Sequence, residues 1–376
     1  MSALNAATPN DTELDAIARS HLRRLAGTPR PTSGAATARQ YCRSALSSLG
    51  FRVREMPFEY SAAVGAYGTP AGGAAVCLVL IGAAEAALGS RAAAALAVLI
   101  VGGLAVALGG RWLASHGVLA LPFMRRHGVN LEATRGDDDP DVWFVAHVDS
   151  KSQPVPLLVR AAGIVLMAIA WIAAVVLAIA TMLGHAAPDL WRAVIVIAVV
   201  GAIPVLGSVV GNRSAGAVDN ASGVATVLGA AATLPDANLG VLITDAEELG
   251  LAGARAWCAE TTRRRVPVLN CDGVDDDGVL TLMWTHPRSL RVETVVRESS
   301  RDFGVLRGIP LVPGVLVDAV AFSDAGWESV TLSRGTLATL RRIHTRRDNL
   351  DHLEGRGLST AALTLALSAR AIMEQH

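Results

Sequence analysis

Four long apolar stretches constrain the fold of this chain more than any other feature of its sequence. They lie at residues 62–88, 92–109, 157–183 and 191–210. A helix needs about 20 apolar residues to cross a hydrocarbon layer about 30 Å thick, and each stretch approaches or exceeds that length. The third, AAGIVLMAIAWIAAVVLAIATMLG, has no polar face at helical spacing, unlike a helix of a soluble core. The sequence therefore predicts four transmembrane helices.

The four stretches form two pairs, each joined by a short turn. The first turn lies around Gly89 and Arg91, and the second has the sequence GHAAPDL. Each pair returns the chain to the side of the membrane from which it started, so the remaining three segments can fold together. The predicted organisation is domain segments at residues 1–61, 111–156 and 212–376, with transmembrane hairpins at 62–110 and 157–211.

Composition supports a membrane portion and excludes some functions. Hydrophobic residues make up 52% of the chain, more than in a typical soluble enzyme. The formal net charge is +0, and no dense basic run is interleaved with aromatic residues, so nucleic acid is not expected as a partner. The four cysteines form no C-x-x-C pair, which predicts buried free thiols. The first residues lack the pattern of a secretory signal.

Outside the apolar stretches, helical and strand patterns alternate. Helices are expected in two parts of residues 12–49, at 221–232 and at 250–261. Strands are expected at FRVREMPFEY, GVNLEAT, DVWFVAHVD, LGVLITD and VPVLNCDG. This order predicts an α/β fold, with a mostly parallel mixed sheet flanked by helices and an active site at the carboxyl ends of its strands.

Acidic and imidazole side chains recur where these elements end. They are His147, Asp149, Asp219, Glu247, Glu248, Asp272 and His344. Each alone has an ordinary explanation, such as a structural histidine or a solvated helix start. Together they would be costly to bury unless a cation or a partner neutralised them.

Two imidazoles and several carboxylates form a nitrogen and oxygen ligand set that suits zinc better than calcium or magnesium. With one bridging carboxylate, two ions could lie about 3.5 to 4 Å apart and activate a shared water. One residue of the Glu247–Glu248 pair can bind metal while its neighbour acts as general base. Asp149, two residues after His147, is placed to fix the tautomer of that imidazole.

These motifs resemble the co-catalytic zinc aminopeptidases of metallopeptidase family twenty-eight, whose relatives include glutamate carboxypeptidases and glutaminyl cyclases. The matching motifs, in the family's order, are AHVDS, GAVDNASGVATVLGAA, ITDAEELGLAGARAW, LNCDG, FSDAGW and IHTRRDNLDHL. The stretch from Pro29 to Tyr60 is similar to the family's opening helix and strand. The resemblance implies a phosphorylase/hydrolase-like zinc peptidase fold, here with four inserted transmembrane helices.

The resemblance also implies the metal ligands. One zinc ion would be bound by His147 and Asp272, a second by Glu248 and His344, and Asp219 would bridge the two. No ligand position is substituted, which disfavours an inactive receptor.

The remaining roles concern the peptide substrate. By the resemblance, Glu247 matches the general base that takes a proton from the attacking water and passes it to the leaving amine of the first peptide bond. Asp149 would fix the tautomer of the His147 imidazole. The motif FSDAGW offers Asp324 and Trp327 for the rim of the substrate site, with helix capping or packing as the alternative for each.

The two hairpins depart from the family's soluble members. The first enters between the strand ending at Tyr60 and the strand around Asn130, and the second separates His147 from Asp219, which a short loop joins in soluble members. We expect the membrane helices to place the site at the bilayer surface. A simple anchor is the alternative.

Charge predicts the orientation in the membrane. The side of the predicted domain carries more basic residues close to the crossings: Arg111, Arg125, Arg126, Lys151, Arg160 and Arg213. The opposite turns carry Arg91 and Arg192. Because positive loops favour the cytoplasm, we expect an integral inner-membrane protein with a cytoplasm-facing catalytic domain.

Other functions remain open at this level. A glutaminyl-cyclase-like acyltransferase would release ammonia from amino-terminal glutamine, and a carboxypeptidase would need a basic group for the substrate carboxylate. A non-catalytic membrane receptor or scaffold would lack bound metal. The sequence predicts neither the preferred side chain nor the oligomeric state.

Overall fold

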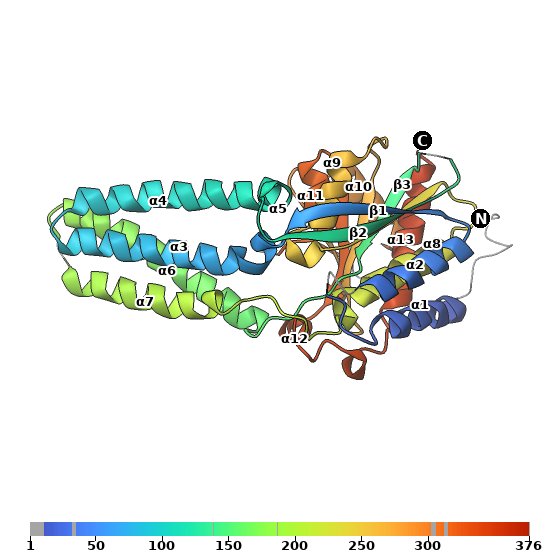
Figure 1. The fold of residues 1–376 in the computed structure, drawn as a ribbon, viewed down its shortest axis with the longest axis horizontal. Helices are drawn as coiled ribbons and strands as arrows, with labels where there is room; N and C mark the ends of the chain where they lie inside the picture. Colours follow the sequence, from blue (N-terminus) through green and yellow to red (C-terminus); the bar gives the residue numbers. More distant parts are fainter. Residues whose placement is uncertain are drawn as a thin grey trace. The chain divides into compact units, whose positions relative to one another are not determined.

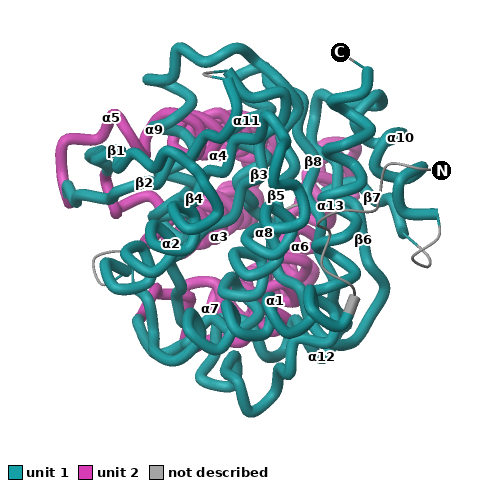
Figure 2. The backbone as a smooth tube through the Cα atoms, turned by 90° about the vertical axis from the view of Figure 1, so that its right-hand side faces the viewer, with its two compact units in different colours: residues 1–60, 125–152, 212–376 teal, residues 61–124, 153–211 magenta. Residues whose placement is uncertain are grey.

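The structure is a computed structural model that describes residues 11–31, 35–137, 139–185, 187–301, 306–311 and 315–375. It divides into two compact units, shown in teal and magenta in Figure 2. Unit 1 comprises residues 1–60, 125–152 and 212–376, and unit 2 comprises residues 61–124 and 153–211. Each unit is built from segments that are far apart in the sequence.

Unit 1 contains an eight-stranded sheet in the order β1-β2-β4-β3-β5-β8-β6-β7. The strands are β1 (Arg52–Ser61), β2 (Arg125–Arg135), β3 (Val142–His147), β4 (Leu239–Thr244), β5 (Val268–Val274), β6 (Val279–Trp284), β7 (Arg307–Pro310) and β8 (Ser329–Gly335). The pairs β4-β3, β3-β5, β5-β8 and β6-β7 are parallel, whereas β2-β4 and β6-β8 are antiparallel. The expected mixed and mostly parallel sheet is confirmed.

Helices flank this sheet, as Figure 1 shows. They are α1 (Asp11–Leu25), α2 (Ala36–Ser48), α8 (Gly223–Ala232), α9 (Ala252–Glu260), α10 (Leu290–Ser299), α11 (Asp318–Asp324), α12 (Leu337–Arg342) and α13 (Leu358–Met373). Short helical turns lie at Ala217–Ser222, Glu247–Leu249 and Leu350–His352.

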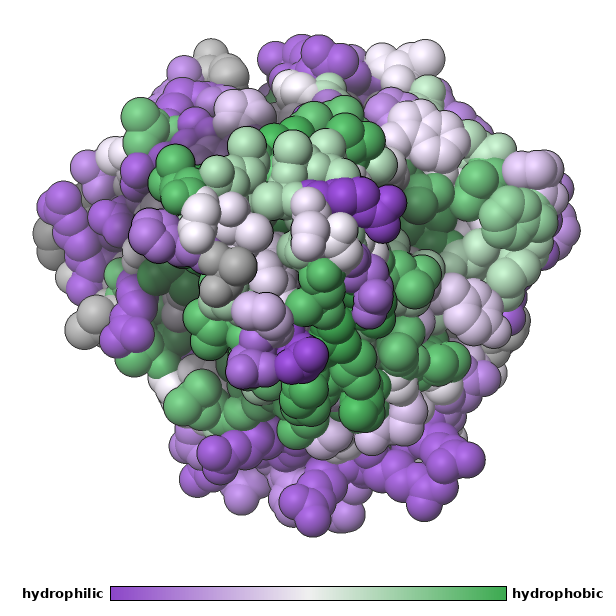
Figure 3. Space-filling view, turned by 90° about the vertical axis from the view of Figure 1, so that its left-hand side faces the viewer, coloured by the Kyte–Doolittle hydropathy of each residue, from purple (hydrophilic) through white to green (hydrophobic). Residues whose placement is uncertain are grey.

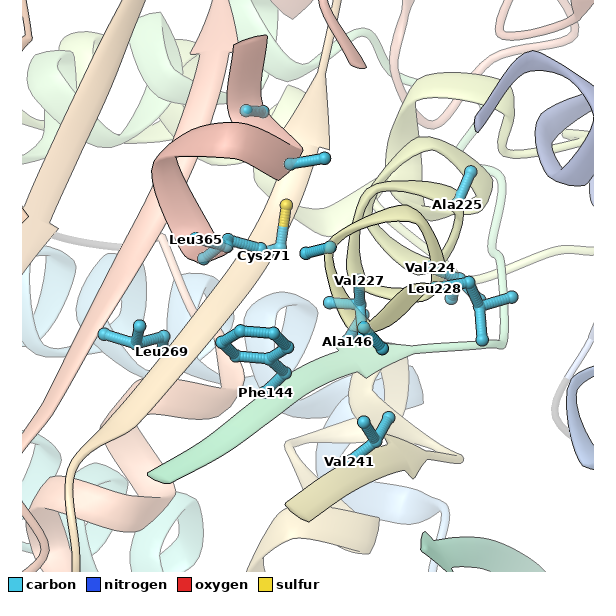
Figure 4. Packing of buried hydrophobic residues seen from close by; sticks show 14 of the residues in the cluster. Phe144, Ala146, Val224, Ala225, Val227, Leu228, Val241, Leu269, Cys271 and Leu365 are labelled. Carbon is cyan, nitrogen blue, oxygen red and sulfur yellow. The ribbon is translucent and has the colours of Figure 1, made fainter. Parts of the chain in front are cut away.

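The central strands β3 and β4 are buried along their whole length. Their apolar runs lack polar alternation because both faces of a parallel sheet are covered. On one face, Phe144 and Ala146 of β3 pack near Val227 of α8 (Figure 4). On the other face, Trp143 packs with Trp257 of α9, their ring centroids 5.1 Å apart. This double cover fixes β3 and β4, and with them the residues at their carboxyl ends.

Unit 2 consists of long apolar helices. They are α3 (Ala63–Leu88), α4 (Ala92–Trp112), α6 (Leu157–Met182) and α7 (Pro188–Leu206). By length and composition, four helices of the described chain could cross a membrane.

Many large apolar side chains of unit 2 point outward, and the buried positions are rich in small residues, although Leu80, Leu99 and Trp191 are also buried. Leu78, Val101 and Ile172 are each at least 65% exposed, whereas alanines such as Ala170 and Ala174 are buried. Hydrophobic side chains occupy much of the face drawn in Figure 3.

The second apolar helix is longer than its sequence predicts. We expected it to end near Gly109, but α4 continues through a π-helical turn, Leu113–Gly117, and a last turn, α5 (Val118–Ala120). The helix ends just before Leu121, which has extended backbone and precedes Pro122. A proline disfavours helical backbone in the residue before it, which explains this end point.

Hydrogen bonds within unit 1 join the residues just before and just after the segment that contains α6 and α7. The Ser152 hydroxyl oxygen accepts a hydrogen bond of 2.8 Å from the backbone N–H of Arg213. The Ser150 hydroxyl donates to the backbone oxygen of Ser214 at 3.2 Å. Residues 152 and 213 are therefore neighbours, although the whole of α6 and α7 lies between them in the sequence.

Helices α6 and α7 approach closely at Gly163 and Gly201. A Cβ atom added to Gly163 would lie 2.5 Å from the backbone oxygen of Gly201, and one added to Gly201 would lie 2.9 Å from that of Gly163. Glycine is required here because backbone, not a movable side chain, occupies the space.

We expect Gly163→Ala to lower the thermal unfolding temperature of the detergent-solubilised protein, because the added methyl group forces α6 and α7 apart. Gly109→Ala in α4 is the matched control, since a Cβ there meets no atom within 4 Å. Alanine favours a helix over glycine by about 1 kcal/mol, so the control should be neutral or stabilising. Equal shifts in the two variants would contradict close packing at Gly163.

Candidate metal centre

The candidate metal centre lies at the carboxyl ends of the parallel strands of unit 1. His147 is the last residue of β3 and pairs in register with Thr244, the last residue of β4. The turn with Glu247 and Glu248 follows β4, and Asp272 lies near the end of β5. Parallel strands bring these three segments to one edge, as the sequence analysis expects.

The structure brings five of the expected residues into two overlapping groups. We name His147, Asp219 and Asp272 the first ligand group, and Asp219, Glu248 and His344 the second ligand group. In each, the candidate ligand atoms all lie within 4.8 Å of one another. Asp219 belongs to both, which is the arrangement expected of a bridging carboxylate.

The distances join the two groups through Asp219. Nε2 of His147 lies 3.2 Å from Oδ1 of Asp219 and 3.7 Å from Oδ1 of Asp272. Nε2 of His344 lies 2.8 Å from Oδ2 of Asp219 and 3.6 Å from Oε2 of Glu248. Each oxygen of Asp219 thus faces a different imidazole.

The donor set fits a pair of divalent ions. Nε2 of His147 is buried and makes no hydrogen bond, although Oδ1 of Asp219 is near enough for one. The direction between the two atoms is therefore unsuited to a hydrogen bond. Buried polar atoms are normally satisfied, and a nitrogen turned toward several carboxylates without a hydrogen bond suits coordination of a cation.

Asp149 links His147 to the glutamate turn. Its carboxylate oxygens accept hydrogen bonds from the backbone N–H groups of Glu247 and Glu248, at 3.1 and 3.2 Å. Nδ1 of His147 lies 3.1 Å from the backbone oxygen of Asp149 and 3.5 Å from its carboxylate. Asp149 therefore contacts Nδ1 of His147, and its carboxylate also fixes the backbone of the glutamate turn that follows β4.

The glutamate turn is held in an uncommon backbone conformation. Ala246 before it and Leu251 after it have φ angles of 59° and 61°, in the left-handed region. Such angles are unfavourable for residues other than glycine and are maintained only where surrounding contacts impose them. The hydrogen bonds that the Asp149 carboxylate accepts from Glu247 and Glu248 are among these contacts, and they hold the glutamate turn beside the end of β3.

Burial and mutual repulsion shift the acidities of the centre. Burial, followed by the charges of Glu248, Asp272 and Asp318, raises the pKa of Glu247 well above its usual range, although His147 opposes this. Burial would also raise the pKa of Asp219, but contacts with His147 and His344 outweigh it and lower that pKa. A nearby cation would stabilise the charged form of a carboxylate whose pKa is raised in this way.

Three residues of the centre's surroundings were not singled out from the sequence as site residues. Nζ of Lys151 lies 2.5 Å from Oε2 of Glu248. The Asp348 carboxylate accepts hydrogen bonds from the backbone N–H groups of Val218 and Asp219, at 2.7 and 3.2 Å. Asp318 is buried, accepts a hydrogen bond from Thr244, and burial raises its pKa to about 7.

The sequence contained a signal for two of these three residues. Lys151 is the single lysine of the chain and follows the AHVDS motif's His147 by four positions. Asp348 lies within the motif IHTRRDNLDHL. Asp318 is the first residue of α11, and an acidic residue in the first turn of a helix is common for structural reasons alone.

The structure does not bring Asp324 and Trp327 to this centre, in contrast to the expected substrate rim. Trp327 is 4% exposed and packs against Trp257 and Phe322, and Asp324 pairs with Arg255 at 3.1 Å. Trp327 also precedes β8, whose first residue, Ser329, pairs with the start of β5, whereas the centre lies at the other end of β5. Packing accounts for Trp327, and the ion pair with Arg255 accounts for Asp324.

We expect Asp348→Asn to lower the affinity for zinc about 10- to 100-fold, the usual effect of removing a partner that orients a metal ligand. The amide group of asparagine offers one acceptor oxygen, so it cannot accept from both N–H groups that position Asp219. Metal affinity is measured by competition with a chelator. Asp351→Asn, an exposed change in the same motif, is the control, and equal affinities in the two variants would exclude this role for Asp348.

Comparisons with known proteins agree with this geometry. Residues 204–369 match the profile described as Peptidase family M28. No curated protein sequence matches the chain. Among solved structures, the zinc aminopeptidase BSAP from Bacillus subtilis is similar in fold, with 15% identity, a TM-score of 0.54, and 94% of each chain covered.

Two further solved structures have the same fold. The aminopeptidase from Aneurinibacillus sp. strain AM-1 has 15% identity and a TM-score of 0.55, with 95% of this chain and 93% of that chain covered. The glutaminyl cyclase from Bacteroides thetaiotaomicron has 11% identity and a TM-score of 0.55, with 96% and 98% covered. Residues 204–369 thus match the profile of peptidase family M28, and the chain shares its fold with solved zinc aminopeptidases and a glutaminyl cyclase.

Proposed function

We propose that this chain is a membrane-bound zinc aminopeptidase that holds two zinc ions. The observation that carries the proposal is the shared position of Asp219, whose two carboxylate oxygens face His147 and His344. Two ligand groups with a common carboxylate support a pair of ions, one on each side of Asp219. The family match supports a peptidase reaction.

In this proposal the first ligand group and the second ligand group each hold one ion. Zinc, when bound, would polarise the substrate carbonyl and make a water molecule easier to deprotonate. His147, Asp219, Asp272, Glu248 and His344 orient the ions, and Asp149 orients both His147 and the glutamate turn.

Glu247 acts as general base. Its carboxylate is buried beside the centre, with Oε2 3.9 Å from Nε2 of His147, and it belongs to neither ligand group. A carboxylate that faces the reacting atoms without binding metal can take the proton of the attacking water. Glu247 then delivers that proton to the nitrogen of the leaving amine.

The proposed substrate is a peptide with a free amino terminus. Zinc aminopeptidases and glutaminyl cyclases both share this fold, so the fold does not separate the two reactions. The two complete ligand groups favour hydrolysis through a pair of ions. A carboxypeptidase is a weaker candidate, because the one lysine beside the centre already pairs with Glu248.

We propose that unit 2 crosses a lipid bilayer. Its four apolar helices have outward-facing large side chains that water would not favour. Because an even number of crossings separates the segments of unit 1, all of them lie on one side. The excess of basic residues beside those segments supports the cytoplasmic side.

Metal content and substrate preference test the proposed function. We expect about two zinc ions per chain in the detergent-solubilised protein, and release of the reporter group from aminoacyl substrates but not from amino-terminally blocked ones. Release of ammonia from amino-terminal glutamine would favour the cyclase. A protein without bound zinc would favour a non-catalytic scaffold.

The same assay includes Glu247→Gln, which tests the general base. This variant should retain zinc and lose activity about 10²- to 10⁴-fold, because glutamine cannot accept the proton. Glu298→Gln, an exposed change on α10, is the control and should keep both properties. Full activity of Glu247→Gln would remove this residue from the mechanism.

Protease protection tests the orientation. In sealed right-side-out vesicles, we expect added protease to leave unit 1 intact until the membrane is permeabilised, because basic flanking residues retain it on the inner side. Digestion of unit 1 from outside would reverse the proposed orientation without affecting the proposed reaction.

A further inference from the structure

Lys151 has an unusual position for the single lysine of the chain. It follows β3 by four residues and contacts both carboxylate oxygens of Glu248. Its backbone N–H donates to Oε1 at 3.2 Å, and its Nζ lies 2.5 Å from Oε2. The ion pair is nearly dry, since the side chains of Lys151 and Glu248 are 18% and 3% exposed. One residue thus occupies both oxygens of a candidate metal ligand.

The ammonium group lies within the second ligand group. Oε2 of Glu248, which contacts Nζ of Lys151, is also the oxygen that lies 3.6 Å from Nε2 of His344. An ion bound between Glu248 and His344 would need this same oxygen. The lysine and the ion therefore compete for one atom.

The first ligand group has no such contact in the described part of the chain. The ion pairs of Asp219 and Asp272 there are with histidines, not with lysine or arginine. Arg30 is close enough to affect Asp219 electrostatically. Its guanidinium group, however, donates to the backbone oxygens of four residues, Leu25, Val148, Ala215 and Gly216. Among the described residues, only the second ligand group thus has a fixed positive charge, that of Lys151, in contact with one of its ligand atoms.

We propose that Lys151 makes the two metal positions unequal, so that the second ligand group binds its ion more weakly and exchangeably than the first. This inference rests on the proposed two-ion function and adds the residue that sets the order of binding. Two positive charges a few ångströms apart repel each other strongly where water is excluded. The second ion must therefore displace the ammonium group from Glu248 or bind against its charge.

Displacement is sterically possible because lysine has a flexible four-carbon stem and a compact charge. The negative charge of Glu248 would stay neutralised, because the metal ion would take the place of the ammonium group. At low zinc concentration the chain would hold one ion in the first ligand group, with Lys151 on Glu248. At higher concentration it would hold two.

The test is a zinc titration of the full-length, detergent-solubilised protein after metal removal, in competition with a chromogenic chelator. We expect the unchanged protein to bind two ions with clearly different dissociation constants. Lys151→Gln and Lys151→Met should tighten the weaker constant at least about tenfold, because the competing charge is gone. Lys151→Arg keeps the charge and should keep two separate steps.

Two further variants assign each step to its position. Asp272→Asn should abolish the tighter step, and His344→Gln the weaker one, because each removes a ligand of one group only. Arg39→Met is the matched control: Arg39 pairs with a buried carboxylate, Asp245, at 3.0 Å, but that carboxylate belongs to neither ligand group. This variant should leave both constants unchanged.

Three outcomes decide the proposal. Equal constants in the unchanged protein would overturn it, as would a weaker constant that Lys151→Gln leaves in place, and the proposed function would stand in both cases. Failure of the unchanged protein to bind zinc would instead overturn the proposed function itself. If Lys151→Met does not fold, Lys151→Gln still gives the measurement, since its amide can donate to Glu248.

Discussion

The concentration of buried negative charge at the ends of β3, β4 and β5 is the constraint on which the rest of unit 1 depends. Carboxylates and imidazoles removed from water are unfavourable without a cation, yet the strands that carry them are held rigidly by packing on both faces. The packing of β3 on both faces, through Trp143 on one and Phe144 on the other, therefore does more than stabilise the domain. It keeps the charged ends close together, where His147, His344 and Lys151 offset part of the negative charge and a bound cation would offset more.

The sequence predicted the parts of the fold that have strong periodic or apolar signals. The four helices of unit 2, the buried strands β3 and β4 and the mixed sheet follow from hydrophobic runs and their order. The last third of the chain was harder to assign: β6, β7 and α12 are short or half-buried and α10 is largely polar, so their patterns are weaker. The apolar helix α13 was not assigned. The end of α4 was misjudged, because the residues after Gly109 remain compatible with a helix until Pro122.

The candidate site was predictable where chemistry and motif coincided. His147, Asp219, Glu248, Asp272 and His344 lie together, although their roles as ligands remain a prediction. Lys151 and Asp348 lie in or beside recognised motifs, but the sequence does not show the contacts that the fold gives them, and no local pattern marks Asp318. Asp324 and Trp327 show the opposite case: the motif is real, but its side chains serve packing away from the centre.

The hydrogen bonds between Ser152 and Arg213, and between Ser150 and Ser214, have a consequence for how such a chain can evolve. They close unit 1 where the segment with α6 and α7 begins and ends, so the backbone on either side already has its partners. For the fold of unit 1, the residues between them are an insertion whose length these hydrogen bonds do not limit. An apolar helical pair can therefore be gained, lost or exchanged there by insertion or deletion, without rebuilding the residues of the two ligand groups.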